Sequence, residues 1–206
     1  MLRTAGWALA VAFVLTSIGS AQEQGRFDVS IGGAGVFSKT STSSNGTVTL
    51  KPTSSGAILA TFRYRFNRMH GIEGNIGHTM NSQVFFIPPD NYRIHAGVTE
   101  YSGAYVFSPF QTARIEPFLF GGAGALRFNP DKTYIDGFQS AFGAAKQTSL
   151  AFLYGGGVDY HLWRFLGLRL QYRGLIYKAP TFAVPILFTG AKGHMAEPAA
   201  GIVIKF

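Results

Sequence analysis

Beyond residue 21, apolar residues alternate with polar ones instead of forming long runs, and this pattern most constrains the fold. No stretch of that part holds eighteen consecutive apolar residues, which excludes a membrane-spanning helix there. In segment 58–66, Ile58, Phe62 and Phe66 share one face, whereas Arg63 and Arg65 share the other. Such a period of two predicts β-strands with one apolar and one polar side.

Eight segments fit this pattern, although the facing of the fourth and fifth is ambiguous. They are 27–37, 58–66, 72–86, 94–107, 115–128, 150–161, 166–178 and 196–206. Pro117 and Pro198 are expected near strand ends, because proline removes a hydrogen-bond donor from the ladder. Short connections (67–70, 108–114 and 162–165) alternate with long or irregular ones (38–55, 87–93, 129–149 and 179–193). An even strand count with this alternation predicts an eight-stranded antiparallel up-and-down transmembrane β-barrel.

Composition supports an all-β chain. The 206 residues include 26 Gly, 19 Phe and 9 Tyr, and only 14% are charged. Glycine disfavours helix interiors and aromatic residues favour strands. The sequence contains no cysteine, which excludes a disulfide scaffold, a thiolate zinc site and a cysteine nucleophile.

The first residues have the pattern of an export signal. Arg3 is followed by an apolar run over 5–18 and then by the small residues Gly19, Ser20 and Ala21. This order predicts a signal peptide over 1–21, cleaved near Ala21, and a barrel domain over 22–206. An uncleaved N-terminal anchor helix is the alternative.

Hydropathy alone does not decide which face of the barrel is apolar. A soluble, secreted lipocalin-like ligand-binding barrel would turn its apolar face inward, and an outer-membrane barrel would turn it outward. The polar faces carry both signs of charge, which favours a narrow lumen filled by ion pairs. This predicted lumen charge network consists of Asp28, Arg63, Arg65, Glu73, Asp159, Arg169, Arg173 and Lys205.

Aromatic residues gather at the ends of the predicted strands, as in the two girdles of a membrane barrel. On the side of the short turns they are Phe66, Phe107, Tyr160, Trp163 and Phe206, and on the side of the long loops Phe37, Phe85, Phe86 and Phe128. We therefore predict that lipid surrounds the barrel.

The alternating C-terminal residues Ile202, Ile204 and Phe206, the predicted signal peptide and the run 121–124 resemble the OmpA-like family of small outer-membrane β-barrels. The resemblance implies the cell outer membrane of a Gram-negative bacterium. It also implies that Ile202, Ile204 and Phe206 form the signal read by the barrel assembly machinery. Peptidoglycan binding in that family belongs to a separate periplasmic domain and is not carried over to this barrel.

No catalytic or cofactor motif stands out. None of the five histidines belongs to a compact set with serine and an acid, no metal-ligand spacing is present, and the glycine runs do not fit a nucleotide fingerprint. His161 lies two residues from Asp159, a pair that we interpret as structural. We predict a structural or surface-interaction role without cofactor, metal or nucleic-acid partner. An enzyme that modifies lipid or peptide at the outer leaflet is the alternative.

The last predicted loop is unusually apolar for a segment in water. It contains Phe182, Val184, Ile186, Leu187 and Phe188. Either this loop contacts a partner, or the neighbouring strands extend into it, and the alternation across Phe182, Val184 and Ile186 favours extension. We otherwise expect a monomer that contacts outer-membrane lipid and reaches any surface partner through its external loops.

Overall fold

A computed structural model describes residues 26–140 and 142–206. The predicted signal peptide over 1–21 lies outside this part. Within the described ranges, helices long and apolar enough to cross a membrane are absent.

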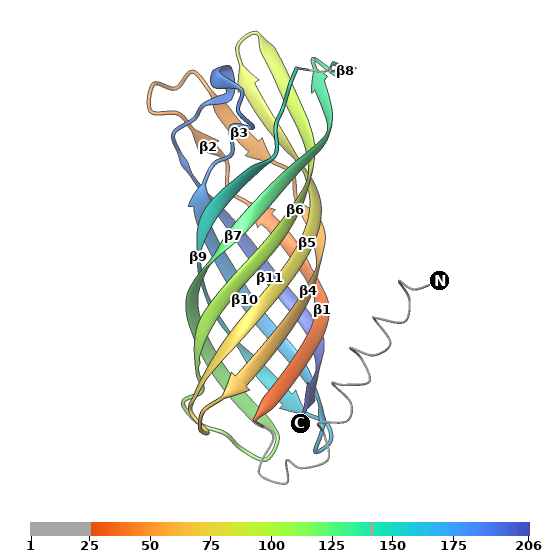
Figure 1. The fold of residues 1–206 in the computed structure, drawn as a ribbon, viewed down its shortest axis with the longest axis vertical. Helices are drawn as coiled ribbons and strands as arrows, with labels where there is room; N and C mark the ends of the chain where they lie inside the picture. Colours follow the sequence, from red (N-terminus) through yellow and green to blue (C-terminus); the bar gives the residue numbers. More distant parts are fainter. Residues whose placement is uncertain (1–25, 141) are drawn as a thin grey trace, which may run out of the picture.

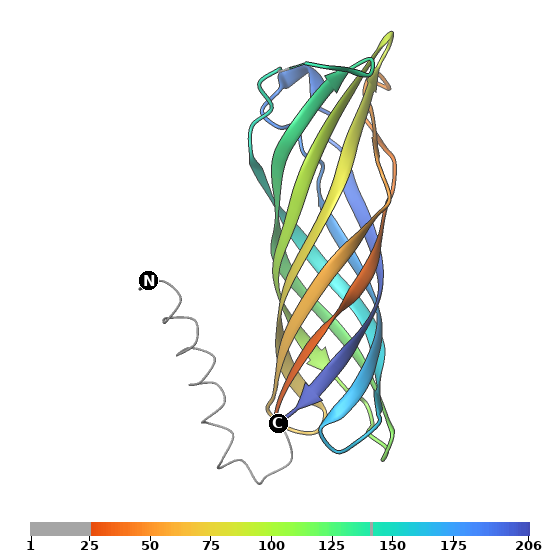
Figure 2. The same cartoon turned by 90° about the vertical axis from the view of Figure 1, so that its right-hand side faces the viewer.

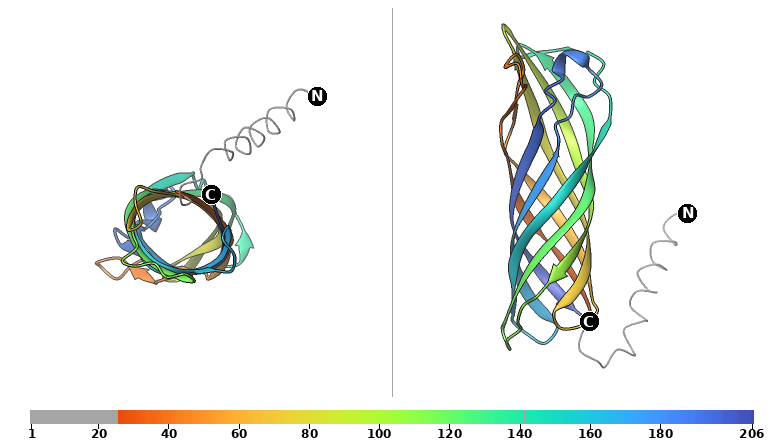
Figure 3. Two further views of the ribbon diagram at one scale, coloured as in Figure 1. Left: turned by 90° about the horizontal axis from the view of Figure 1, so that it is seen from below. Right: turned by 90° about the vertical axis from the view of Figure 1, so that its left-hand side faces the viewer.

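Eight long strands form a closed antiparallel barrel, as the alternating sequence predicted (Figures 1 and 2). In chain order they are β1 (Phe27–Ser38), β4 (Ser55–Arg65), β5 (His70–Ile87), β6 (Asp90–Phe107), β7 (Ile115–Ile135), β9 (Gln147–His161), β10 (Leu166–Lys178) and β11 (Lys192–Lys205). Each strand pairs with the next, and the pairing of β1 with β11 closes the ring. The view along the barrel axis shows this closed wall (Figure 3).

The apolar faces of the strands point outward. Ile58 and Leu170 are 67% and 62% exposed, whereas Arg63 and Arg169 of the same two strands are buried inside the barrel. This arrangement contradicts the lipocalin-like alternative, since a soluble barrel would expose its charges and bury its isoleucines. The outer surface therefore suits lipid, and the lumen is where the buried charges meet.

The upper hairpins in Figure 1 are longer than the sequence predicted. Segment 87–93 is not a long loop, because β5 and β6 continue to a tight turn at Pro88–Pro89. Similarly, β7 continues to Ile135 and pairs with the two-residue strand β8 (Phe138–Gln139). Two further short strands, β2 (Ser41–Thr42) and β3 (Thr49–Pro52), lie within 38–55, and β3 extends the sheet beside β5. These extensions lack the apolar alternation of a lipid-facing strand, which is why the pattern missed them.

Three residue placements predicted from the sequence were wrong, one for a proline and two for aromatic residues of the outer girdle. Pro198 lies in the middle of β11, where the ladder to β1 is interrupted opposite Gly35 and Val36. This gap removes the need for a proline N–H donor.

Phe85 and Phe128 do not belong to an outer girdle, because both side chains point inward and are fully buried. Phe37 and Phe86, also assigned to that girdle, are exposed as predicted.

Glycines of β9 make room for aromatic rings inside the barrel. A Cβ added to Gly157 would lie 2.7 Å from Cζ of Phe118, and one added to Gly155 would meet the ring of Phe120. The same Cβ atoms would also meet the carbonyl oxygens of Leu170 and Tyr172, respectively, so the paired backbone of β10 and the two rings of β7 both require glycine here.

Candidate functional site

Four acidic and four basic side chains form one ion-pair cluster in the lumen at the end that carries the short turns. Arg169 donates through Nε to Asp159 Oδ1 at 2.7 Å and through Nη2 to Asp28 Oδ1 at 2.9 Å. Arg63 donates through Nη2 to Glu73 Oε2 at 2.9 Å. The cluster, hereafter the turn-side charge cluster, comprises Asp28, Arg63, Arg65, Glu73, Glu116, Asp159, Arg169 and Lys205. Its formal charges balance, which offsets the cost of removing them from water.

Glu116 joins the two cations of the cluster nearest the turns. Its Oε2 accepts a hydrogen bond from Lys205 Nζ at 2.7 Å, and its Oε1 lies 2.8 Å from Arg65 Nη2. His161 Nε2 also lies 3.4 Å from Glu116 Oε2 and 3.2 Å from Lys205 Nζ. His161 therefore contacts Glu116 rather than pairing with Asp159.

An aromatic ring covers the inner side of this cluster. The guanidinium carbon of Arg63 lies 4.1 Å from the ring centroid of Phe118, and that of Arg169 lies 5.2 Å from it. Both distances suit cation–π attraction, which stabilises cations that have lost water. Phe118 thus packs against two cations of the turn-side charge cluster.

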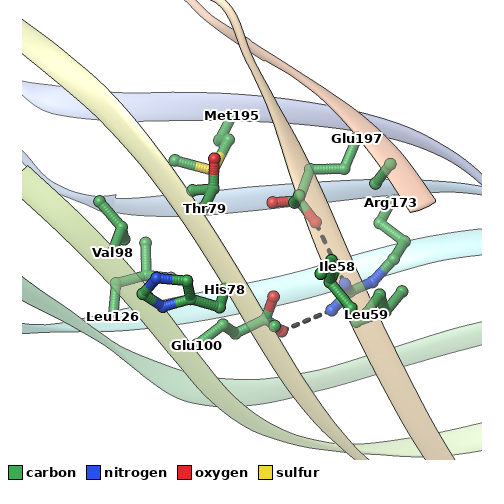
Figure 4. Close-up of a pocket in the computed structure, with 13 residues that line it drawn as sticks. Ile58, Leu59, His78, Thr79, Val98, Glu100, Leu126, Arg173, Met195 and Glu197 are labelled. Carbon is green, nitrogen blue, oxygen red and sulfur yellow. Dashed lines mark hydrogen bonds and ion pairs between the residues drawn. The ribbon is translucent and has the colours of Figure 1, made fainter. Parts of the chain in front are cut away.

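A second, smaller ion cluster lies further along the lumen (Figure 4). Arg173 donates through Nη2 to Glu100 Oε1 at 2.5 Å and through Nη1 to Glu197 Oε2 at 3.1 Å. A cavity of about 10 Å³ adjoins all three residues, which is close to the space that one water molecule requires. The formal charge of this second ion cluster is −1, in contrast to the balanced turn-side charge cluster.

The structure brings seven of the eight predicted network residues together and places Arg173 in the second cluster. Sequence reasoning missed Glu100 and Glu116 because they lie on β6 and β7, whose inward faces also carry apolar residues such as Val98 and Phe120. Glu197, which is buried inside the barrel, is also absent from the predicted network. Its position opposite Arg173 in the β10–β11 ladder was the available signal.

The loop-side half of the lumen is mainly apolar, although Asn81 and Gln83 of β5 are buried there as well. Phe182 packs edge-on against Phe85 and Phe128, with ring centroids 6.4 and 6.1 Å apart. Phe182 and Leu187 are fully buried, although both belong to the connection between β10 and β11. We refer to these residues and their buried neighbours as the apolar plug: Phe85, Ile94, Phe128, Leu153, Leu175, Phe182 and Leu187.

The connection between β10 and β11 folds over the plug, which contradicts the predicted extension of the strands. It contains the short 3₁₀ helix η2 (Pro185–Leu187), and Phe182 and Ala183 have φ angles of 53° and 58°. Left-handed backbone in such residues costs about 1–2 kcal/mol each. Gln147 Oε1 accepts hydrogen bonds from the N–H groups of Thr181 and Phe182, each at 2.8 Å, and holds this conformation.

A polar cavity of about 560 Å³ lies among the extended hairpins of β5, β6 and β7. Arg93, His95, Tyr134 and Asp136 line it, and His95 Nδ1 forms a hydrogen bond with Ser82 Oγ at 2.8 Å. Ser82 is only 7% exposed and does not line the cavity. A serine and a histidine are thus in contact near the external rim, but only the histidine belongs to the wall of the cavity.

The predicted assembly residues lie on the lipid-facing side of the closing strand. Ile202, Ile204 and Phe206 are all exposed at the outer surface of the barrel. Their side chains alternate with the inward-facing Val203 and Lys205. The edge of β11 is already paired with β1, so these residues are seen here in the closed barrel.

Comparison with known proteins agrees with this architecture. The model of the outer membrane protein beta-barrel domain family matches residues 7–195. The outer membrane protein OprG from Pseudomonas aeruginosa has 16% identity and a TM-score of 0.57, covering 89% of this chain and 97% of that chain. Ail, the attachment invasion locus protein of Yersinia pestis, crystallised with the heparin analogue sucrose octasulfate, has 16% identity and a TM-score of 0.54, covering 89% and 100%.

The N-terminal β-barrel domain of OprF from Pseudomonas aeruginosa has 14% identity and a TM-score of 0.50, covering 89% of this chain and 100% of that domain. At such identities these similarities show the fold alone. A comparison with curated protein sequences gives no match.

Proposed function

Because this chain belongs to the outer membrane protein beta-barrel domain family, we propose that it is a non-conducting barrel with a structural and surface-interaction role in the outer membrane. The apolar plug carries this proposal. Phe182 and Leu187 fill the loop-side end of the lumen, and two ion clusters occupy the rest. An eight-stranded barrel has an interior only wide enough for side chains, so ions have no open path through such packing.

The lumen charges have a structural purpose in this proposal. The bilayer offers no solvation for ionised groups, so charges within a barrel wall are retained where they pair with one another. The predicted network residues and their added partners Glu100, Glu116 and Glu197 then hold opposite walls of the barrel together. Any specific activity resides on the external surface rather than in the lumen.

Conductance measurements in planar lipid bilayers test the closed lumen. Insertion of the folded protein should add no stepwise current above that of the bare bilayer, because the apolar plug excludes hydrated ions. A heat-dependent shift on a detergent gel verifies that the sample is folded. Stepwise currents from the folded wild-type protein would contradict the proposal.

We also propose the route by which the barrel reaches the membrane. Export removes residues 1–21 by cleavage near Ala21, and the barrel assembly machinery binds the alternating Ile202, Ile204 and Phe206. The outward direction of these side chains supports this role, because a receptor meets that face before lipid does. The barrel then remains a monomer, with its external loops available to a surface partner.

The enzyme alternative has one observation in its favour, the contact between Ser82 and His95. Nucleophilic catalysis requires an accessible hydroxyl and a base oriented by a third group. Ser82 is covered, and Asp136 Oδ1 accepts a hydrogen bond from the N–H of Asn91. We therefore propose a non-catalytic barrel, and labelling of Ser82 by a fluorophosphonate probe would contradict this.

A further inference from the structure

The positive charge of this protein is concentrated outside the lumen. Among the described residues, all acidic side chains except Asp90, Asp131 and Asp136 lie in the two lumen ion clusters. The three exceptions belong to β6, β7 and the turn that follows β7. The opposite wall, at the loop ends of β1, β10 and β11, therefore carries cations without nearby acids.

Three lysines gather at these strand ends. Lys178 and Lys192 are directly opposed in the β10–β11 ladder. On the other side of β11, the N–H of Lys39 donates to the carbonyl oxygen of His194 at 2.9 Å, two residues from Lys192. All three side chains are exposed, and within the described ranges none has an ion-pair partner. We call Lys39, Lys178 and Lys192 the lysine triplet.

The opposed pair is unfavourable in the isolated protein. Directly facing residues of an antiparallel pair have Cβ atoms about 4.5–5.5 Å apart, and like charges at that distance destabilise a sheet. Lumen cations, in contrast, have carboxylates within ion-pair distance. An anion from outside the chain that lies between or above Lys178 and Lys192 would remove this repulsion.

The lysine triplet lies at the boundary of the lipid-facing surface. Phe37 and Ile176, each two residues nearer the membrane on β1 and β10, are exposed apolar side chains. His194 directly faces Ile176 in the β10–β11 ladder, and its Nε2 forms a hydrogen bond with the hydroxyl of Tyr154 at 2.8 Å, giving an aromatic pair with polar atoms at that level. Tyrosine of this kind is enriched at the level of lipid head groups. The ammonium groups are thus at the height of the head groups.

We propose that the lysine triplet binds the phosphate of an anionic lipid in the outer leaflet. Three ammonium groups offer up to nine N–H donors to phosphate oxygens, and the acyl chains of the same lipid would lie against Phe37 and Ile176. A phosphate between Lys178 and Lys192 converts their repulsion into two attractions. The inference rests on the outer-membrane surface role proposed above, but it does not depend on a closed lumen.

Binding is measured by native mass spectrometry of the folded barrel in dodecyl maltoside micelles, which contain no phosphate, with phosphatidic acid as the added lipid. Because a cation near an anionic surface contributes about 1 kcal/mol, the variant Lys178→Gln/Lys192→Gln should bind about tenfold more weakly or worse. Lys51→Gln is the matched control, since Lys51 is an exposed external lysine whose ladder partner is Val84. The control should retain the affinity of the wild type.

Thermal stability provides a second readout, because the difference in unfolding temperature between the double variant and the wild type should change sign when the lipid is added. In phosphate-free micelles the double variant should unfold at the same temperature as the wild type or at a higher one, because the like-charge pair is gone. With phosphatidic acid present, the wild type should gain stability that the variant does not gain.

Three results would overturn the proposal: equal lipid binding by the double variant, an equal loss in Lys51→Gln, or the same stabilisation by inorganic phosphate as by the lipid. The last would indicate a site for free anions. Since conductance is measured separately, a failure here leaves the proposed closed barrel standing.

Discussion

The two halves of the lumen are filled in opposite ways. Near the short turns the interior is ionic, and Arg169 lies between Asp28 and Asp159. Near the long loops it is mainly apolar, and Phe182 packs against both Phe85 and Phe128. The ionic half gains its order from directional hydrogen bonds, whereas the apolar half gains stability from buried area and depends on one loop. A barrel wall of uniform geometry can therefore surround two different kinds of core.

The largest expected effect comes from the ionic half. Arg169→Ala leaves Asp28 and Asp159 without their principal partner in a buried site, and the free energy of unfolding should fall by about 3–5 kcal/mol. Equilibrium urea unfolding in lipid vesicles measures this. Arg164→Ala, at an exposed turn position, is the control and should change little. A loss as small as that of the control would mean that the ion cluster contributes no structural constraint.

Truncation of the plug should have a somewhat smaller effect, because the loop can relax. Phe182→Ala removes a fully buried ring and should lower the free energy of unfolding by about 3 kcal/mol. Phe188→Ala is the matched control in the same loop, since Phe188 is 56% exposed. The same unfolding assay compares them. If the two variants lose equal stability, the plug is not a core.

The smallest effect concerns the support of the plug. Gln147→Ala removes the oxygen that accepts the N–H groups of Thr181 and Phe182, which should cost about 1–2 kcal/mol. The loss should be local, so amide hydrogen exchange of Phe182 should accelerate more than exchange within β4. Gln139→Ala, at an exposed position of β8, is the control. Equal protection of Phe182 in both variants would show that burial alone orders the loop.

Period-two alternation was sufficient to predict the barrel, and it selected seven of the eight side chains that form the turn-side charge cluster. On β10, Leu168, Leu170 and Tyr172 are exposed on the outside of the barrel, whereas Arg169 and Arg173 are buried inside it. The prediction works there because residues that face lipid are apolar while residues that face the lumen are charged. The two faces of each strand therefore differ in polarity.

The apolar half could not be predicted in this way. On β6 and β7 the inward residues Val98, Phe118 and Phe120 are as apolar as lipid-facing ones, and the contrast between the faces disappears. The fold of the loop that carries Phe182 depends on contacts with Phe85 and Phe128, which are distant in sequence. Alternation describes local periodicity only and contains no information about such contacts.

The pairing of β1 with β11 has a consequence for how the barrel is made. It joins Asp28 to Lys205, residues near opposite ends of the described chain, and no other ladder in the ring spans so much sequence. The entropy lost on closing a loop grows with its length, so this ladder is the costliest contact to form. Until it forms, both strands present open edges to other chains. Assembly therefore has a single committing step, and a chain lacking β11 would remain an open sheet however well its other strands paired.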